Sequence, residues 1–408
     1  METRKILLII CDGMGDRLSK GKTPLEEAEK MNMDFIAKNG ICGIMDPVRQ
    51  GIRPGSDTAH LSLLGYDPFK VYTGRGALEA LGLGIEIAEN EIALRCNFAT
   101  IKNGKIIDRR AGREEYGLEE IAAQLSGMKI DGVEIELHKA SGHRGVLILR
   151  GEGLSAKISD SDPEKENVPI QEVKALMPSK EAKKTAGVLN KFTRLALEIL
   201  KDHKINKDRV KMGKLPANAI LCRGAGTKPE IPSLEEKYGL KGICISATTL
   251  IKGVCRAAGM DTPPVEGATG HIDSNIKEKA KLALKVFDRY DLILLHIKGT
   301  DEASHDGNFD AKVKMIERID KEVVEILLNK INLDEVTLVL TSDHSTPISI
   351  RQHSADPVPI AIIGDVRVDQ VKKFTERECA KGGLNRIHGM YLMDMLLDLS
   401  NRAKLFGA

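Results

Sequence analysis

The sequence TSDHSTPISIRQHSADPVP, residues 341–359, follows directly on the apolar run VTLVL of residues 336–340. A short apolar run of this kind is typical of a strand that is buried on both faces of a parallel sheet. Open α/β sheets bind their ligands beyond the carboxyl ends of such strands. Asp343, His344 and His353 fall there, and divalent metal ions favour carboxylate and imidazole ligands. The stretch therefore predicts an α/β fold with a metal cluster to which other strand ends must contribute.

Two further apolar runs end in the same kind of polar residue. Lys5 to Cys11 leads into Asp12, and Asp291 to Ile297 leads into KGTDEASH, which contains Asp301 and His305. Because they are four residues apart, Asp301 and His305 can face one centre only if a helical turn joins them. The candidate residues at predicted strand ends are Asp12, Ser56, Asp301, His305, Asp343, His344 and His353. This set can fill two metal sites that each keep a position open for substrate.

Asp343 and His344 are adjacent, so in a regular strand their side chains would point to opposite faces. In a turn after the strand both can converge, and two neighbouring metal ions would suit adjacent residues. A single His is more often a hydrogen-bonded structural residue than a ligand. That explanation is poor for a whole set that gathers at the strand ends of one sheet.

Ser56 lies in GIRPGSDTAH, at or just before a helix predicted over Thr58 to Leu64. Gly55 allows a tight turn there, and a helix N-terminus offers free amide groups and a positive potential that suit a phosphate. The alternative is an ordinary serine N-cap, which is the commoner role. Spacing alone favours the N-cap.

The order of predicted strands and helices along the sequence divides the chain into an α/β core, residues 1–72 and 232–408, and an α+β insertion, residues 73–231. In the core, the capping box at Thr23 to Glu26 predicts a helix that runs to about Lys38 and ends at Gly40. The other expected core elements are strands over Ile41–Met45, Gly242–Ser246 and Pro359–Ile363, a helix containing Lys252, and helices over Phe309–Lys330 and Gly389–Asn401.

In the insertion, short alternating segments predict a separate sheet. They are Ile92–Ile101, Gly132–Leu137 and Gly145–Leu149. The polar stretch Asp160–Lys184 predicts an exposed loop, and Thr185–His203 an amphipathic helix.

Three loops of the insertion place arginine next to glycine: residues 108–113 (DRRAGR), 141–144 (SGHR) and 223–227 (RGAGT). Guanidinium groups in such loops can bind phosphate or carboxylate through paired hydrogen bonds. A solvated surface arginine is the better interpretation of any single loop. The presence of three such loops in one insertion modestly favours an anion site.

The composition limits the classes of partner. Among 408 residues, 61 Lys and Arg nearly cancel 59 Asp and Glu, and Trp is absent, so we expect no nucleic-acid or membrane partner. No run approaches the roughly 20 apolar residues that span a bilayer, and Ile6 to Ile10 is too short for a signal peptide. Seven dispersed cysteines without a C-x-x-C pair predict reduced core thiols, and we expect a cytoplasmic protein. The sequence leaves the oligomeric state open.

Five motifs in order, CDGMGD, PGSDTAHLSLLGYDP, KGTDEASHDG, TSDHSTP and HSADPVP, resemble the cofactor-independent phosphoglycerate mutases of the archaeal type. The resemblance extends to RECAKGGLNRIHG and LFGA near the C-terminus. That family belongs to the alkaline-phosphatase-like superfamily. The resemblance implies a three-layer αβα core, with residues 73–231 as a transferase-like lid.

The resemblance also implies an activity, the interconversion of 3-phosphoglycerate and 2-phosphoglycerate without 2,3-bisphosphoglycerate. Ser56 would be the nucleophile that forms a phosphoserine. Asp12, Ser56, Asp343 and His344 would bind one metal ion, and Asp301, His305 and His353 the other. The implied substrate contacts are Arg110, Arg113, His143, Arg144, Arg223 and Lys252. The bacterial cofactor-independent mutases have more arginines around the position that corresponds to Arg223. Residues 224–228 of this sequence depart from that pattern.

The ligand types fit Mn²⁺ first, with Zn²⁺, Co²⁺ or Mg²⁺ as alternatives. Two other functions compete with the mutase. One is a metal-dependent phosphatase or another phosphomutase of the superfamily, such as one acting on a pentose phosphate. The other is a non-catalytic binding protein, which the presence of Ser56 beside six candidate ligands disfavours because a binder needs no nucleophile.

Overall fold

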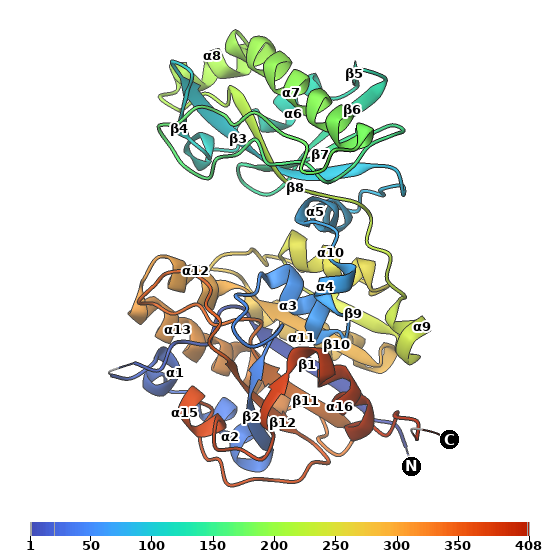
Figure 1. Ribbon diagram of the computed structural model, residues 1–408. Helices are drawn as coiled ribbons and strands as arrows, with labels where there is room; N and C mark the ends of the chain where they lie inside the picture. Colours follow the sequence, from blue (N-terminus) through green and yellow to red (C-terminus); the bar gives the residue numbers. More distant parts are fainter. Residues whose placement is uncertain (1, 20, 406, 408) are drawn as a thin grey trace. The chain divides into compact units, whose positions relative to one another are not determined.

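The computed structural model describes residues 2–19, 21–405 and 407. Its contacts divide the chain into two compact units. The core unit comprises Met1–Tyr72 and Ile231–Ala408, and the inserted unit comprises Thr73–Glu230 (Figure 1). Each unit has its own sheet and its own hydrophobic core.

The core unit is built on a seven-stranded sheet with the strand order β13-β2-β12-β11-β1-β10-β9. Only β12 runs antiparallel to its neighbours. The strands are β1 (Lys5–Cys11), β2 (Ile41–Asp46), β9 (Gly242–Ile245), β10 (Leu292–Ile297), β11 (Val336–Thr341), β12 (Val358–Ile363) and β13 (Asn385–His388). The apolar runs predicted as buried strands are confirmed, because β10 and β11 are buried throughout and β1 everywhere except its first residue.

Helices cover both faces of this sheet, which confirms the predicted αβα layering (Figure 1). Leu7, Ile9 and Cys11 point to the face covered by α2 (Met31–Asn39), α11 (Ile276–Val286) and α13 (Phe309–Ile319). Helix α13 continues through a π-helical turn, Asp320–Val324, into α14 (Glu325–Leu328). The remaining helices of the unit are α1 (Pro24–Glu27), α3 (Ser56–Leu63), α4 (Pro68–Val71), α9 (Leu234–Tyr238), α10 (Thr249–Ala257), α12 (Gly299–His305), α15 (Glu376–Cys379) and α16 (Leu392–Leu399).

The single helix predicted from Thr23 to about Lys38 is wrong, because two helices occupy that stretch. The capping box is present, and α1 follows it, but the backbone is extended at Ala28. Helix α2 then begins where the Asp320 carboxylate accepts hydrogen bonds from the backbone N–H groups of Asn32 and Met33, at 3.2 and 2.7 Å. Gly40 does follow the end of α2, but with extended backbone rather than in the left-handed region.

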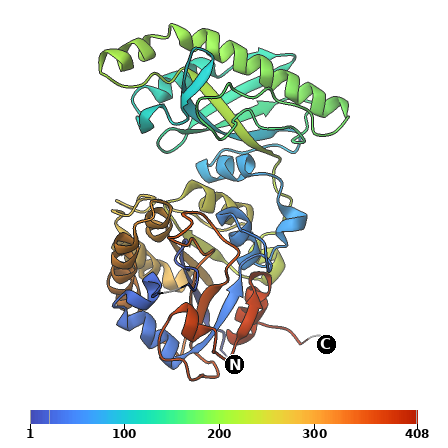
Figure 2. The ribbon, with the colours of Figure 1, turned by 60° about the vertical axis from the view of Figure 1, so that its left-hand side comes forward.

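The inserted unit contains a six-stranded antiparallel sheet with the order β4-β3-β7-β6-β5, and β8 pairs with the other edge of β3. Helices α6 and α7 pack on one face and α5 on the other (Figures 1 and 2). The elements are α5 (Arg75–Leu83), β3 (Ile92–Lys102), β4 (Lys105–Asp108), α6 (Leu118–Leu125), β5 (Met128–Ile130), β6 (Val133–Lys139), β7 (Arg144–Arg150), α7 (Lys180–Lys201), α8 (Lys204–Lys211) and β8 (Ala219–Gly226).

The exposed loop predicted over Asp160–Lys184 is wrong at both ends. Helix α7 begins at Lys180, where the Ser179 hydroxyl caps it. Ser161 and Asp162 are buried. The Ser161 hydroxyl accepts a hydrogen bond from Cys222 N at 2.8 Å, and the Asp162 carboxylate accepts two from the Arg109 guanidinium at 2.9 and 2.6 Å. This stretch is a structural loop tied to the sheet.

All seven cysteines are buried free thiols, as predicted. Within the described residues, no helix is both long and apolar enough to cross a membrane.

Candidate active site in the core unit and anion site in the inserted unit

The candidate ligands follow three adjacent parallel strands, β11, β1 and β10. Asp12 comes directly after β1, and Asp343 and His344 lie in the turn after β11. Asp301 and His305 lie on α12, which starts just after β10. Parallel strands end at one edge of a sheet, and this places residues distant in sequence together.

Asp12, Ser56, Asp343 and His344 form one buried group. The Nε2 atom of His344 lies 3.3 Å from Asp12 Oδ1, 3.5 Å from Asp343 Oδ2 and 3.2 Å from Ser56 Oγ. Ser56 is the first residue of α3 and is buried, with 7% of its surface exposed. The turn after β11 lets the adjacent Asp343 and His344 converge.

Asp301, His305 and His353 form a second group. Asp301 Oδ1 lies 3.3 Å from His305 Nε2 and 3.6 Å from His353 Nε2. Asp301 and His305 are brought together by one turn of α12, as their spacing required. The second group adjoins the first, because donor atoms of Asp301, His344 and His353 also lie within 4.8 Å of one another.

In each of the three histidines of these groups, Nδ1 donates a hydrogen bond and Nε2 points towards the carboxylates. His353 Nδ1 donates to Pro54 O at 2.8 Å, and His305 Nδ1 donates to Arg351 O at 2.9 Å. His344 Nδ1 donates to Thr346 Oγ1 at 2.9 Å, since that hydroxyl itself donates to Asp301 Oδ1. In the neutral rings Nε2 therefore carries the free lone pair, and this atom faces the carboxylates. Such hydrogen bonds fix the tautomer and ring orientation of metal-ligating histidines.

Two buried carboxylate oxygens support a cation site. Asp12 Oδ1 and Asp343 Oδ2 have no hydrogen-bond partner among the described residues, and His344 Nε2 lies 3.3 and 3.5 Å from them as an ion-pair partner. Buried carboxylate oxygens that share one imidazolium and lack hydrogen bonds are costly unless a further cation compensates their charge. Burial alone would lower the pKa of His344, but Asp343 and Asp12 raise it to about 9. A metal ion would release that proton. The donor set and its unpaired atoms thus fit divalent metal ions.

The site contains residues that the sequence did not single out. Lys298 Nζ lies 3.1 Å from Asp12 Oδ2 and 2.5 Å from Asp301 Oδ2, so its ammonium joins one carboxylate of each group. His296 Nε2 lies 2.9 Å from Asp12 Oδ2, and His60 Nδ1 donates to Ser56 O at 2.7 Å. A histidine within the apolar run DLILLHI was a signal for a buried polar contact; Lys298, directly after that run, was another.

The residues implied as substrate contacts lie in both units. Lys252 is half-buried on α10 of the core unit, and burial lowers its pKa. The other five are in the inserted unit, where Arg144 begins β7 and Arg223 lies in β8. The pKa of His143 is lowered to about 4 by burial and by Arg144 and Arg110, so these residues lie in one positive environment. Arg113 contributes to the same effect. Arg223 is paired with Glu164.

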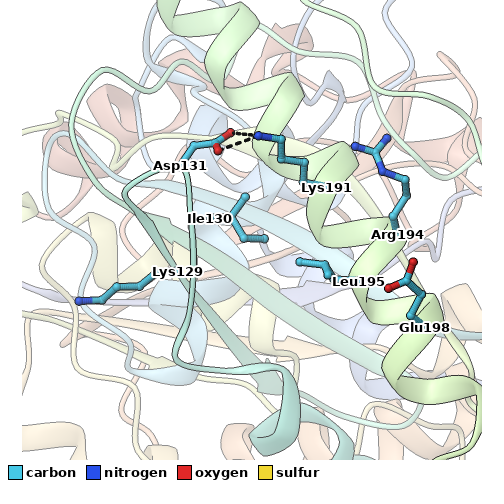
Figure 3. A pocket seen from close by; sticks show the side chains of 7 residues that line it. All are labelled: Lys129, Ile130, Asp131, Lys191, Arg194, Leu195 and Glu198. Carbon is cyan, nitrogen blue, oxygen red and sulfur yellow. Dashed lines mark hydrogen bonds and ion pairs between the residues drawn. The ribbon is translucent and has the colours of Figure 1, made fainter.

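A separate surface pocket of the inserted unit lies beside β5 and α7 and contains none of the candidate residues. Lys191 Nζ lies 2.6 and 2.7 Å from the Asp131 carboxylate oxygens within it (Figure 3). Its lining residues are Lys129, Ile130, Asp131, Lys191, Arg194, Leu195 and Glu198. The Asp131 charge is already paired, so this pocket does not extend the candidate site.

Comparison with known proteins identifies the family. A family model described as 2,3-bisphosphoglycerate-independent phosphoglycerate mutase matches residues 37–206. A protein of that description from Methanocaldococcus jannaschii is 51% identical over 412 residues, which cover 100% of both chains. The chain belongs to this family. A Methanothermobacter thermautotrophicus protein of the same description is 50% identical and covers 99% of this chain and 100% of its own.

Two solved structures are similar to nearly the whole chain, and one of them is described as a cofactor-independent phosphoglycerate mutase. A Pyrococcus horikoshii protein is 40% identical with a TM-score of 0.88, and 100% of each chain is covered. The cofactor-independent phosphoglycerate mutase of Thermoplasma acidophilum is 38% identical with a TM-score of 0.70, over 97% of this chain and 100% of its own. The chain is thus an enzyme of the phosphoglycerate mutase family, as its five motifs predicted.

Proposed function

We propose that this enzyme interconverts 3-phosphoglycerate and 2-phosphoglycerate through a phosphoserine on Ser56, at a site that binds two divalent cations. The observation that carries the proposal is the position of Ser56. Its hydroxyl lies at the start of α3, 3.2 Å from His344 Nε2, in a buried group with the Asp12 and Asp343 carboxylates. The alternative of a serine N-cap is wrong, because Gly55 is the N-cap of α3 and Ser56 is the first helical residue.

The two groups described above would each hold one cation. Asp12, Ser56, Asp343 and His344 would hold the first, and Asp301, His305 and His353 the second. A bound divalent cation lowers the pKa of a coordinated hydroxyl and neutralises charge on a phosphoryl group. Imidazole with carboxylate ligands favours Mn²⁺ over Mg²⁺, with Zn²⁺ and Co²⁺ also compatible.

Ser56 Oγ attacks the phosphorus of 3-phosphoglycerate. The bond from phosphorus to the substrate's 3-oxygen breaks, the Oγ–P bond forms, and the proton lost by Ser56 ends on the 3-hydroxyl of glycerate. Glycerate then turns so that its 2-hydroxyl attacks the phosphoserine, and the proton of that hydroxyl returns to Ser56 Oγ. The position of Ser56 at the N-terminus of α3 favours the negative charge of the bound group.

The charges around Asp12 keep its carboxylate ionised, as a ligand of a divalent cation must be. Burial would raise its pKa, but Lys298 and the hydrogen bond from His296 hold the pKa well below its usual range. His60 fixes the backbone of the nucleophile through its bond to Ser56 O. These residues act on Asp12 and on the backbone of Ser56, and so position the reacting group.

The inserted unit would act as the lid. Water competes with glycerate for the phosphoserine in every turnover, so the enzyme must retain glycerate and exclude water between the two transfers. The arginines of the inserted unit offer carboxylate-binding groups for that purpose. A core without such retention would act as a phosphatase.

One assay separates these functions. Purified protein receives 3-phosphoglycerate and Mn²⁺ without 2,3-bisphosphoglycerate, while 2-phosphoglycerate is followed through enolase and free phosphate is measured in parallel. We expect 2-phosphoglycerate with little phosphate, and loss of both products in Ser56→Ala. Phosphate without 2-phosphoglycerate would instead establish the phosphatase. A Ser56→Ala protein with normal turnover would remove the phosphoserine route.

A further inference from the structure

Helix α13 of the core unit carries a lysine that is fully buried. Lys312 has 0% of its surface exposed, and the later residues Met315, Ile316 and Ile319 of the same helix are buried in the apolar core. Taking an ammonium group out of water is costly, and hydrophobic residues often replace buried charges without loss of stability. A lysine at this position therefore indicates a role for its N–H donors.

The Lys312 ammonium joins the loop after β1 to the loop after β11. Its Nζ atom donates hydrogen bonds to Gly15 O at 3.1 Å, to Asp16 Oδ2 at 3.1 Å and to Thr346 O at 3.0 Å. The first two acceptors lie in the loop after β1, and the third lies in the loop after β11. An ammonium has three donors, so these three acceptors use all of them. One side chain thus holds together two loops that both carry candidate metal ligands.

Thr346 extends this contact to both candidate metal groups. Its hydroxyl accepts a hydrogen bond from His344 Nδ1 at 2.9 Å and donates one to Asp301 Oδ1 at 3.0 Å. His344 belongs to the first group and Asp301 to the second. Lys312 holds the backbone carbonyl of Thr346, so it acts on one ligand of each group through a single intermediate residue.

The segment that carries His353 is attached at the same place. Ser345 forms a β-bridge with Gly15 on one side and with Ser354 on the other, and Ser354 N donates to Ser345 O at 2.9 Å. A Cβ atom at Gly15 would collide with the Ser345 hydroxyl, so the two loops are in close contact. The Lys312 contacts therefore reach the neighbours of ligands in both groups.

Asp16 attaches the loop after β11 at a second point. Its Oδ2 atom accepts hydrogen bonds from Lys312 Nζ and from Ile348 N, at 3.1 Å each. Its own backbone N–H donates to the Glu376 carboxylate at 3.0 Å. Removal of the Lys312 ammonium would leave the Asp16 carboxylate buried without the cation that it now contacts. We expect such a change to loosen both loops.

We propose that Lys312 is a positioning residue that sets the separation of the two candidate cation positions, by holding Thr346 against the loop after β1. This inference rests on the proposed function, in which His344 and Asp301 bind different cations. In-line phosphoryl transfer requires both cations at fixed places around the phosphoryl group. A changed separation therefore lowers the rate of transfer more than the binding of substrate.

The experiment compares full-length wild type with Lys312→Met, which removes the ammonium and keeps a long unbranched side chain. Both proteins are loaded with Mn²⁺, the bound metal is counted, and the electron paramagnetic resonance spectrum is recorded. Two Mn²⁺ ions that are held close together couple magnetically, and the coupling depends on their distance. We expect a coupled pair in wild type. In Lys312→Met we expect weaker coupling, or binding of one Mn²⁺ ion that is weaker by about tenfold or more.

Two further measurements follow the loops and the reaction. In the metal-free protein, hydrogen exchange in residues 345–353 should be about tenfold or more faster in Lys312→Met, because hydrogen bonds to a charged group are lost. With Mn²⁺ bound, kcat for 3-phosphoglycerate should fall about a hundredfold while KM stays near the wild-type value, since a displacement of about 1 Å suffices for such a loss.

Two variants of the same helix serve as controls. Lys314→Met removes the same charge from an exposed position and should behave as wild type. Ile319→Ala removes buried apolar contacts and should lower the melting temperature while keeping the magnetic coupling and the exchange in residues 345–353. An Ile319→Ala protein whose spectrum changed as much as that of Lys312→Met would overturn the inference, because general loosening of the core would then be the cause.

The outcomes separate this inference from the proposed function. Wild type that binds fewer than two Mn²⁺ ions, or two without coupling, overturns the two-cation site itself. A coupled pair in wild type, with spectrum and loop exchange unchanged in Lys312→Met, overturns the role of Lys312 alone. If Lys312→Met does not fold, the double variant Lys312→Met with Asp16→Asn, which also neutralises the partner carboxylate, decides the question by the same measurements.

Discussion

The imidazole rings of His344 and His353 stack with their centroids 3.5 Å apart, although their Nε2 atoms face different carboxylates. His344 faces Asp12 at 3.3 Å, and His353 faces Asp301 at 3.6 Å. The segment Ser345–Gln352 joins them, and its Thr346 also links His344 to Asp301 through two hydrogen bonds. One loop therefore fixes the separation of the two candidate metal positions.

Replacing His353 with alanine is expected to remove one metal position and keep the other. Asp301 and His305 alone offer too few ligands, whereas the group around Asp12 keeps its own donors. Metal analysis after gel filtration should give two Mn²⁺ per chain for wild type and one for His353→Ala. His271→Ala, which removes an exposed histidine bonded to Glu302, should keep two. An unchanged metal content in His353→Ala would contradict the assignment of two positions.

Lys298→Met is expected to bind Mn²⁺ more tightly and to be less stable without metal. The Lys298 ammonium neutralises Asp12 and Asp301 in the metal-free protein, and the same charge repels an incoming cation. Charges about 4 Å apart in a partly buried site interact by several kcal/mol, so we expect affinity to rise at least about tenfold. Calorimetric titration with Mn²⁺ and melting of the metal-free protein measure the two effects.

The surface variant Lys277→Met, on α11, serves as the control for net charge and should change neither quantity. Weaker Mn²⁺ binding by Lys298→Met would mean that the ammonium organises the ligands more than it competes with the cation.

Glu376 is expected to make the protein less stable as the pH rises. Burial raises its pKa to about 7, although hydrogen bonds from Thr23 Oγ1 and Asp16 N oppose this shift. A raised carboxyl pKa means that the folded state binds the proton more tightly than the unfolded chain does. The stabilisation is therefore complete below the ordinary pKa of 4.5 and is lost as the pH rises through about 7.

Glu376→Gln keeps the side-chain shape and removes the titration. Each pKa unit corresponds to about 1.4 kcal/mol, so the free energy of unfolding of wild type should fall relative to that of the variant by up to about 3 kcal/mol between low pH and pH 8. Urea unfolding at several pH values between about 5 and 8 measures the difference. Parallel pH profiles for the two proteins would show that Glu376 does not titrate in this range.

The apolar strands and the positions of the candidate ligands directly after them could be predicted because each depends on local sequence. Asp12, Asp301 and Asp343 each follow a short apolar run, and parallel pairing brings those ends together. Lys298 and His296 were missed because a polar residue within or directly after an apolar run does not tell which carboxylate it will contact. Their contacts with Asp12 depend on the pairing of β1 with β10.

The break between α1 and α2 escaped prediction for a related reason. Nothing between Thr23 and Lys38 marks it, since the group that starts α2 is the carboxylate of Asp320, far along the chain. The burial of Asp162 likewise depends on Arg109, which lies in another segment. Long-range polar contacts of this kind leave no local pattern.

Asp320→Ala is expected to destabilise the core unit by about 1–3 kcal/mol, because it removes the acceptor for the first N–H groups of α2. The Asp320 carboxylate also accepts a hydrogen bond from the Asn32 side chain at 2.7 Å, so its removal takes the acceptor from three donors at this helix start. Urea unfolding measures the loss, and hydrogen exchange should accelerate first in residues 31–39. Asp310→Ala removes an exposed acidic residue from the first turn of α13 and should leave exchange in α2 unchanged. If Asp320→Ala lowered stability while exchange in residues 31–39 stayed at the wild-type rate, the helix start would not depend on this carboxylate.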